Sequence, residues 1–203
     1  MRQVLLLSIF LFSHILFAEG KHEKLSLLYR KIQDLQQEKK YTESLPYIQK
    51  YLSLQKENIS LQLIYATSLL FRSDLPVIHA EDNVYDKEEK RQVLHSNYQK
   101  ASFLFAKNIS LLLKLYPPPD ANLNEQKKQF LQKKQEEIAK YYFYHALSNV
   151  YLQKYDFAIQ LFQKSIRHYI HKEAYYNIAS LYEEMGKYSE ARIYFQKYEE
   201  VSR

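Results

Sequence analysis

Histidines are the first residues whose spacing could support chemistry in this 203-residue chain. His168 and His171 stand three residues apart, so two imidazoles on one face of a helix could share a metal ion. No acidic residue or third histidine that would complete the ligand set is evident beside them. We therefore expect a solvated turn at these residues, with a metal site as the alternative.

Other arrangements that support catalysis are missing. Gly20 and Gly186 are the only glycines, which excludes a glycine-rich phosphate loop, and there is no cysteine to act as a nucleophile. Adjacent carboxylates on a helix point to different sides and cannot share a proton. This applies to both acidic pairs, Glu183 with Glu184 and Glu199 with Glu200. The sequence predicts a protein that is not an enzyme, with no catalytic residues, no bound metal and no cofactor.

Two asparagines begin patterns that match glycosylation acceptors, Asn58 in Asn-Ile-Ser and Asn108 in a second Asn-Ile-Ser. Asn58 precedes an apolar run and is better explained as the N-cap of a helix, because its side chain can accept from the first free backbone N–H groups. Asn108 falls inside an apolar helical pattern. We expect modification at neither residue.

The first 20 residues have the composition of a secretory signal peptide. Residues 4–17 are apolar except for Ser8, Ser13 and His14, and Ala18 and Gly20 supply the small residues that a signal peptidase recognises. The 14-residue run is shorter than the roughly 20 residues that a spanning helix needs, so an uncleaved membrane anchor is the weaker alternative. We expect residues 21–203 to be exported, to the periplasm or beyond the cell.

The remaining chain has an all-α composition. The whole 203-residue chain is 46% apolar, with only 2 glycines and 5 prolines and with many good helix formers. The net charge of +6 is mild and the lysines are interspersed with acidic residues, which indicates solvated helix faces. An exported protein rarely meets nucleic acid, so we expect no nucleic-acid partner.

A regular helical pattern near the end of the chain resembles a known repeat. Tyr175, Ile178, Ala179 and Tyr182 follow one helical stripe, Gly186 breaks it, and a second stripe runs from Ala191 to Phe195. This order resembles the tetratricopeptide repeat (TPR), in which small residues stand where two antiparallel helices cross. The resemblance implies a right-handed superhelix of helical hairpins, with about three to four repeats.

The preceding unit, at about 140–170, is an imperfect copy. We place its packing residues in a register with a turn two residues shorter and without glycine: Tyr144, Leu147, Ser148, Tyr151, Tyr155, Ala158 and Phe162. The alternative register puts Ala146 in the small slot without a deletion, but it places Asn149 at the position that Tyr182 occupies in the last repeat. The predicted packing residues of the last repeat are Tyr175, Ile178, Ala179, Tyr182, Gly186, Tyr188, Ala191 and Phe195.

Upstream the pattern weakens. The predicted ranges are a degenerate repeat at 25–58, a repeat at 59–118 with an insertion at 73–95, a repeat at 121–170 with an extended first helix, and the best match at 172–203. The prolines at 117–119 should end one helix, and Asp120 should cap a long helix over about 121–152. Its lysine-rich first half is read as a solvated strut, with a basic partner surface as the alternative.

In TPR proteins the first helix of each repeat lines the inner groove. The resemblance therefore implies a groove lined by Tyr29, Gln33, Leu63, Thr67, His145, Asn149, Tyr176 and Ser180. This set has no Lys or Arg, unlike the TPR class that clamps a C-terminal carboxylate. We expect an exported scaffold or adaptor that binds a protein or an extended peptide in the cell envelope. The alternatives are a non-catalytic binder of an envelope polymer and an accessory domain of an envelope enzyme complex.

The last predicted helix also suggests self-association. Ile193, Tyr194, Tyr198 and Val201 cannot all pack within one hairpin, so we expect part of an apolar strip to stay uncovered. Either a second copy in a homodimer or the protein partner could cover it.

Overall fold

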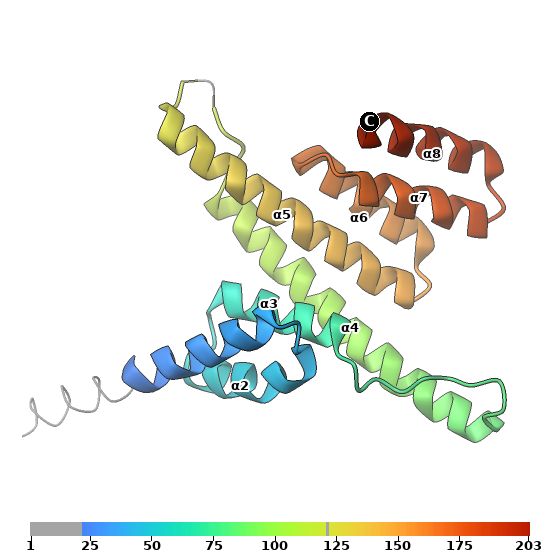
Figure 1. Ribbon diagram of the computed structural model, residues 1–203, viewed down its shortest axis with the longest axis horizontal. Coiled ribbons are helices and arrows are strands. Elements are labelled where there is room, and N and C mark those ends of the chain that lie inside the picture. Colours follow the sequence, from blue (N-terminus) through green and yellow to red (C-terminus); the bar gives the residue numbers. More distant parts are fainter. Residues whose placement is uncertain (1–21, 121) are drawn as a thin grey trace, which may run out of the picture.

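The computed structural model describes residues 22–120 and 122–203, and in these ranges it contains helices and no strands (Figure 1). A helix covers residues 22–37. It is followed by α2 (Tyr41–Leu54), α3 (Ile59–Phe71), α4 (Val84–Leu115), α5 (Glu125–Tyr151), α6 (Tyr155–His168), α7 (Lys172–Glu184) and α8 (Tyr188–Ser202). None of the helices in the described part of the chain is both long and apolar enough to cross a membrane. The predicted signal peptide lies outside the described residues.

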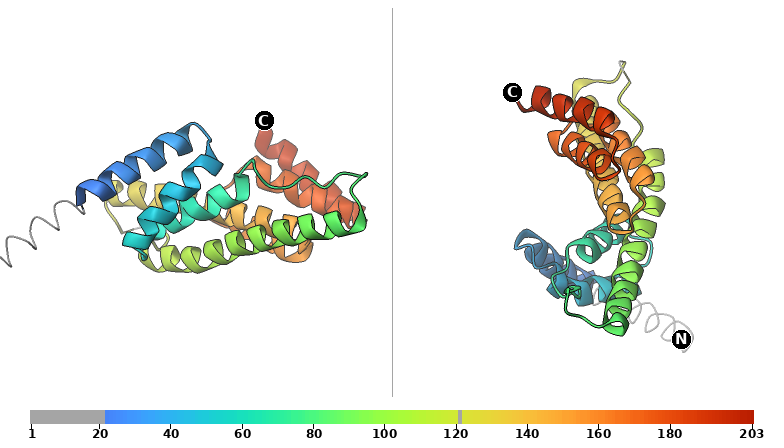
Figure 2. Two further views of the ribbon diagram at one scale, coloured as in Figure 1. Left: turned by 90° about the horizontal axis from the view of Figure 1, so that it is seen from below. Right: turned by 90° about the vertical axis from the view of Figure 1, so that its right-hand side faces the viewer.

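Consecutive helices pair as antiparallel hairpins. The 22–37 helix pairs with α2, α3 with α4, α5 with α6, and α7 with α8, while α4 against α5 and α6 against α7 join one hairpin to the next. In the right-hand view of Figure 2, the first and last helices lie to the same side of α4, so the stack is curved. The predicted fold class, an all-α solenoid of helical hairpins, is confirmed.

Three hairpin turns share one backbone conformation. Lys39, Gln153 and Gly186 have φ angles of 57°, 57° and 72°, in the left-handed region that ends a helix. In each turn the residue that follows donates its N–H to a carbonyl five residues back, as Lys154 does to Asn149 and Lys187 does to Tyr182. Gly186 adopts this conformation freely, whereas Gln153 does so at a cost of about 1 kcal/mol.

The turn after α5 therefore has the full length, and the register with a shortened turn is wrong. Gln153 stands 33 residues before Gly186, which makes Ala146 the counterpart of Ala179 and Asn149 the counterpart of Tyr182. Both alanines are completely buried. The predicted register assumed an aromatic residue at the position equivalent to Tyr182. It was wrong because Asn149 occupies that position and Gln153, not a glycine, occupies the turn.

Burial separates the predicted packing residues into three groups. Ser148, Ala158, Phe162, Ile178, Ala179 and Ala191 are buried, and Tyr144, Leu147, Tyr155, Tyr175, Tyr182 and Phe195 are half-buried. Tyr151 and Tyr188 are 54% and 69% exposed, so their assignment to the hairpin interior is wrong. Both stand at helix ends beside a turn. Tyr151 stacks instead on Tyr98 of α4, with ring centroids 4.5 Å apart.

We expect Ala146→Leu to destabilise the protein by about 1–3 kcal/mol, the usual cost of adding methylenes to a close helix crossing. Ala179→Leu should have a similar effect, because it occupies the same slot. Ala106→Leu, on the exposed side of α4, is the matched control and should change stability little. Urea denaturation measures all three, and an Ala146→Leu protein as stable as the control would contradict the corrected register.

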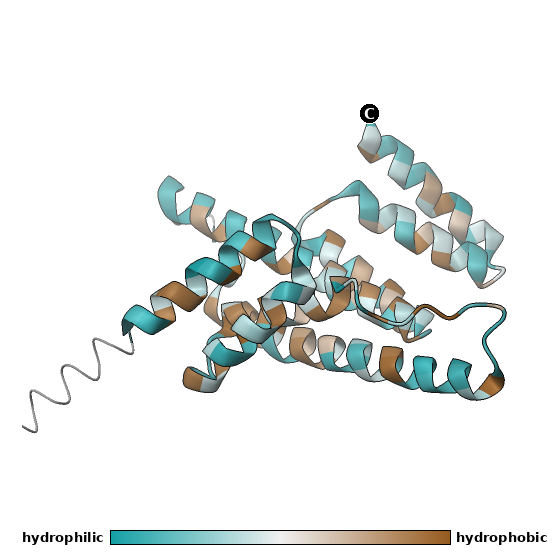
Figure 3. Ribbon diagram, turned by 60° about the horizontal axis from the view of Figure 1, so that its bottom comes forward, coloured by the Kyte–Doolittle hydropathy of each residue, from teal (hydrophilic) through white to brown (hydrophobic). Residues whose placement is uncertain are grey.

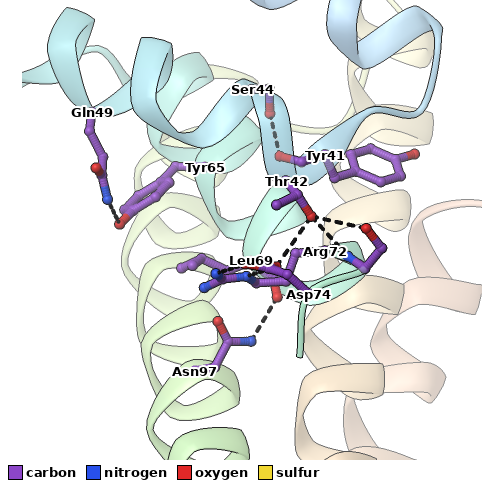
Figure 4. Close-up of polar contacts among 10 residues, drawn as sticks. Tyr41, Thr42, Ser44, Gln49, Tyr65, Leu69, Arg72, Asp74 and Asn97 are labelled. Atoms are coloured by element: carbon purple, nitrogen blue, oxygen red, sulfur yellow. Dashed lines mark hydrogen bonds and ion pairs between the residues drawn. The ribbon is translucent and has the colours of Figure 1, made fainter. Parts of the chain in front are cut away.

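Residues 72–83 form the loop of the predicted insertion, and α4 begins immediately after it. Ser73 N donates to Thr42 Oγ1 of α2 at 2.9 Å, and Arg72 pairs with Asp74, which fixes the start of the loop (Figure 4). Further along, Lys90 Nζ donates to Asp82 at 2.6 Å. The loop therefore lies against the first turns of α4, which project beyond the other helices and are largely hydrophilic (Figure 3).

The helix that follows the prolines begins later than predicted. Asn124, not Asp120, is the N-cap of α5, and its side chain accepts from Lys127 N at 2.9 Å. Asp120 instead accepts from Asn122 N within a turn. With 27 residues, α5 is about 40 Å long, shorter than the predicted helix. Asn58 caps α3 as expected, by accepting from Leu61 N.

Candidate partner-binding groove

The corrected register gives the groove positions on α5. Phe143 and Leu147 stand 33 residues before Tyr176 and Ser180 of α7. Tyr29 and Gln33 precede the turn residue Lys39 by the same spacing as Tyr176 and Ser180 precede Gly186, so they occupy the equivalent positions. An aromatic residue therefore occupies one equivalent position in three helices, at Tyr29, Phe143 and Tyr176. Tyr29 and Tyr176 are 36% and 51% exposed, and Phe143 is half-buried. Sequence reasoning missed Phe143 and Leu147, although a constant 33-residue offset from Tyr176 would have found them.

Three predicted groove residues are buried and cannot contact a partner in this conformation. His145, Asn149 and Leu63 are 4%, 2% and 1% exposed. His145 and Asn149 face α4, where His145 Nε2 lies 3.1 Å from Ser102 Oγ and Asn149 Nδ2 donates to the same oxygen at 3.0 Å. These side chains join two hairpins, so their assignment to the groove is wrong.

Leu63 and its neighbour Thr67 belong to α3, which is buried on most of its surface. Thr67 is half-buried and its hydroxyl donates to the carbonyl of Leu63 at 2.9 Å. This helix packs against α2, α4 and α5 at once, so little of it is left for a partner. Of the predicted groove residues, Tyr29, Gln33 and Tyr176 are exposed, and Ser180, like Thr67, is half-buried.

A pocket of about 320 Å³ opens between α5 and the start of α7, beside Phe143. Its lining residues are Glu136, Ala139, Lys140, Phe143, Tyr144, Tyr169, His171 and Glu173. Phe143 packs edge-on against Phe162 of α6 and against His171, with ring centroids 5.2 Å apart in both pairs. Phe162 and His171 therefore hold the ring of Phe143 in place while the ring still borders the pocket.

A second hollow of about 240 Å³ continues along α7. It is lined by Lys172, Glu173, Tyr176, Asn177 and Tyr198. Tyr176 packs edge-on against Phe195 and Tyr198 of α8, with centroids 5.9 Å and 5.6 Å away. Glu173 borders both hollows, so the two adjoin, the first beside α5 and the second between α7 and α8. We call this surface the α5–α7 groove.

His171 forms a neutral wall of this groove. The Ser165 hydroxyl donates to Ala139 O at 2.6 Å, so its oxygen accepts from His171 Nε2 at 2.8 Å. Burial lowers the pKa of His171, and the nearby Glu173 carboxylate offsets this only in part. The lowered pKa favours the uncharged imidazole at neutral pH.

Charges at the pocket rim are two carboxylates and one ammonium. Glu136 and Glu173 are exposed, and Lys140 Nζ lies 5.6 Å from the ring centre of Tyr144 in a cation–π contact. With His171 neutral, the pocket carries a net negative charge over an aromatic floor. Such a surface can bind an apolar side chain and a neighbouring cation.

His168 and His171 do not share a site. His168 Nδ1 lies 2.7 Å from Gln135 Oε1, and its ring stacks on Tyr142, whereas His171 bonds Ser165. Both histidine side chains are half-buried, whereas Tyr169 and Ile170 between them are exposed, so the predicted solvated turn is present but the two histidines are not its solvated residues. Within residues 22–120 and 122–203, no group of three or more His, Asp or Glu side chains is arranged to hold a metal ion.

Comparison with known proteins assigns neither a family nor a function to this chain. No protein-family model matches the chain, and no curated protein sequence matches it. Among solved structures, MamA from Desulfovibrio magneticus RS-1 is similar over 89% of this chain and 96% of that chain, with 14% identity and a TM-score of 0.37. MamA from MSR-1 covers 88% and 96% with 15% identity and a TM-score of 0.37, and MamA from AMB-1 covers 88% and 91% with 15% identity and a TM-score of 0.32. Likenesses at these TM-scores support neither a shared partner nor a shared activity.

Proposed function

We propose that this protein is a non-enzymatic adaptor that binds an extended segment of another protein in the α5–α7 groove. The observation that carries the proposal is the repeated aromatic slot, in which Phe143 and Tyr176 border adjoining hollows on successive hairpins. Aromatic rings that are already held by neighbours offer large contact areas at a small entropic cost. A curved stack of rigid hairpins presents such rings at regular intervals along an extended chain.

The partner's terminus is not the feature recognised. The accessible slots on the three first helices carry Tyr29 with Gln33, Phe143 with Leu147, and Tyr176 with Ser180, and none is a Lys or Arg. A carboxylate clamp needs cations at such positions. The proposal is therefore that internal segments with apolar side chains are bound.

Location in the cell envelope is part of the proposal and rests on the signal-like residues 1–20. Pull-down with residues 21–203 from an envelope fraction tests it together with the binding role. A stoichiometric protein partner supports the adaptor, and retention on purified cell-wall polymer supports the alternative of a polymer binder. Capture of neither would contradict both functions.

Self-association through α8 is a further proposal, with fewer exposed residues than the sequence predicts. Ile193 and Val201 are 53% and 42% exposed, whereas Tyr194 and Tyr198 are half-buried against Tyr182 and Tyr176. The uncovered strip thus consists of two residues of the four predicted. Two exposed side chains give a weak interface at most.

We expect light scattering to show a concentration-dependent dimer that is lost in an Ile193→Glu, Val201→Glu double variant. These positions leave the tyrosine contacts of α8 intact, so the variant should stay folded. An Arg192→Glu variant adds acidic charge to a different face of the helix, because Arg192 is exposed and lies off the stripe of Ile193 and Val201, and it should still dimerise. A wild-type protein that is strictly monomeric at high concentration would remove the homodimer.

A further inference from the structure

The exposed side of α4 carries positive charge without negative charge. From Lys90 to Pro119 the sequence contains no Asp or Glu, although acidic and basic residues are mixed over most of the rest of the chain. Lys100, Lys107 and Lys114 lie in this stretch, are exposed, and stand seven residues apart. Seven residues make almost two helical turns, so the three side chains form a row along one face of α4, at intervals of about 10 Å.

The charge of this lysine row is not neutralised among the described residues. The ion pairs of α4 in that part of the chain are confined to its first turns. Lys100 Nζ instead bonds Tyr65 Oη at 2.9 Å and lies 5.0 Å from the centre of that ring. Glu57 lines the same hollow as Lys107, where the neighbouring Lys56 offsets its charge. The row therefore favours an anionic partner.

An exposed aromatic ring stands within this row. Phe103 is 67% exposed and lies on the same face of α4, between Lys100 and Lys107 in the sequence. In the right-hand view of Figure 2 the first and last helices lie to one side of α4, so its exposed face belongs to the outer side of the curved stack. A ring left in water there would gain free energy from burial against an apolar partner.

The neighbouring helix α6 extends this face. Phe157 is 43% exposed, and its ring packs edge-on against His145 of α5, with centroids 5.8 Å apart. His145 also contacts Ser102 of α4, so Phe157 lies beside α4. Lys164 is exposed and lies two turns further along the same side of α6. We call this surface the α4–α6 outer face: Lys100, Phe103, Lys107, Lys114, Phe157 and Lys164.

We propose that the α4–α6 outer face binds the surface of a lipid bilayer that contains anionic headgroups. The lysines are attracted to the headgroup phosphates, while the phenylalanine rings reach the boundary between headgroups and acyl chains. The long lysine side chains can lie along the apolar region and keep their ammonium groups among the headgroups. This binding is separate from the α5–α7 groove and does not depend on the adaptor function.

Other occupants fit this face less well. A second copy in a two-fold contact would bring the lysine rows of both copies together, which like-charge repulsion opposes. A soluble polyanion would pair with the lysines but would leave Phe103 and Phe157 in water. An outward-facing surface also lacks the concave shape in which an extended peptide is enclosed. Cations around exposed rings are instead typical of helices that lie on a membrane.

Sedimentation with lipid vesicles tests the proposal. Residues 21–203 contain all the described helices and omit the apolar run at 4–17, which can enter a bilayer by itself. One lysine near an anionic surface strengthens binding about fivefold. We therefore expect binding about 100-fold tighter or more to phosphatidylcholine vesicles with about one third phosphatidylglycerol than to phosphatidylcholine alone. High salt should release the protein.

Charge variants locate the binding face. The combined changes Lys107→Gln, Lys114→Gln and Lys164→Gln should weaken binding to the anionic vesicles about 100-fold and leave the fold intact, because all three lysines are exposed. The matched control removes the same charge from other exposed lysines and should lose much less: Lys31→Gln, Lys133→Gln and Lys197→Gln. No binding of the wild type to anionic vesicles, or equal losses in the two triple variants, would overturn the proposal. Binding of soluble polyphosphate without binding of vesicles would overturn it in favour of a soluble polyanion.

A fluorescent reporter tests whether the phenylalanines meet lipid. The chain has no tryptophan, so Phe103→Trp introduces a single one. On addition of anionic vesicles we expect its emission to shift to shorter wavelengths and to be quenched by brominated lipids. Tyr176→Trp, in the α5–α7 groove, is the control and should not respond. A response at position 176 in place of position 103 would overturn the assignment of the face, and so would no response at position 103 in vesicle-bound protein.

Discussion

Acidification from about pH 6.5 to pH 4 is expected to destabilise the wild-type protein by about 3 kcal/mol more than it destabilises His145→Gln. His145 is 4% exposed, and burial, with a smaller effect of Lys164, lowers its pKa from 6.5 to about 4. In the unfolded chain His145 takes up a proton near pH 6.5, while in the folded protein it stays neutral until about pH 4. Protons therefore favour unfolding in this interval, and the stability present above pH 6.5 is lost toward pH 4.

Urea denaturation at a series of pH values measures this difference. His168 and His171, whose pKa values burial also lowers, act in the same direction but are present in both proteins and cancel in the comparison. His95→Gln, an exposed histidine of α4, is the control and should keep the wild-type pH dependence. If His145→Gln loses stability as steeply as the wild type, His145 is not the buried group that the structure describes.

Truncation of Tyr176 is expected to weaken partner binding about 10- to 100-fold, because a central aromatic anchor typically contributes 1–3 kcal/mol. Its exposure of 51% means that Tyr176→Ala should reduce the stability of the fold little. Asn149→Ala is expected to do the opposite. Asn149 bonds Ser102 and the carbonyl of His145, so its removal should lower stability and leave affinity unchanged.

Calorimetric titration with the captured partner and urea denaturation of each variant separate the two effects. Tyr188→Ala is the matched control, since Tyr188 is a 69% exposed tyrosine on α8 that lines neither hollow. It should change neither quantity much. Equal affinity losses for Tyr176→Ala and Tyr188→Ala would contradict the groove, and so would an affinity loss confined to Asn149→Ala.

Hydrophobic periodicity was enough to predict the helices, since the apolar residues from Tyr175 to Tyr182 follow the i, i+3, i+4, i+7 spacing of an α-helix. The last turn could also be predicted, because Gly186 is the residue that most easily adopts a positive φ. Local patterns could not reveal Gln153 in the same conformation. There the packing of α5 against α6 compensates for the local strain, and packing is not visible in a sequence window.

The candidate site was predicted only where the register was right. Tyr176 and Ser180 follow from the well-marked last repeat, whereas the shift of register on α5 led to His145 and Asn149 in place of Phe143 and Leu147. The burial of Leu63 had a different cause. Leu63 occupies a groove slot by spacing, but α3 is enclosed by several helices, and only the assembled stack reveals this.

The central claim is that a partner lies in the α5–α7 groove, and site-specific photo-cross-linking tests it most directly. A photoreactive phenylalanine analogue is placed at Tyr176 or Phe143, and at Phe103 of α4 as a control that is 67% exposed on the second helix of its hairpin. After irradiation in an envelope fraction, the account predicts one partner cross-linked from positions 176 and 143 and none from 103. Cross-linking of that partner from position 103 alone would contradict it.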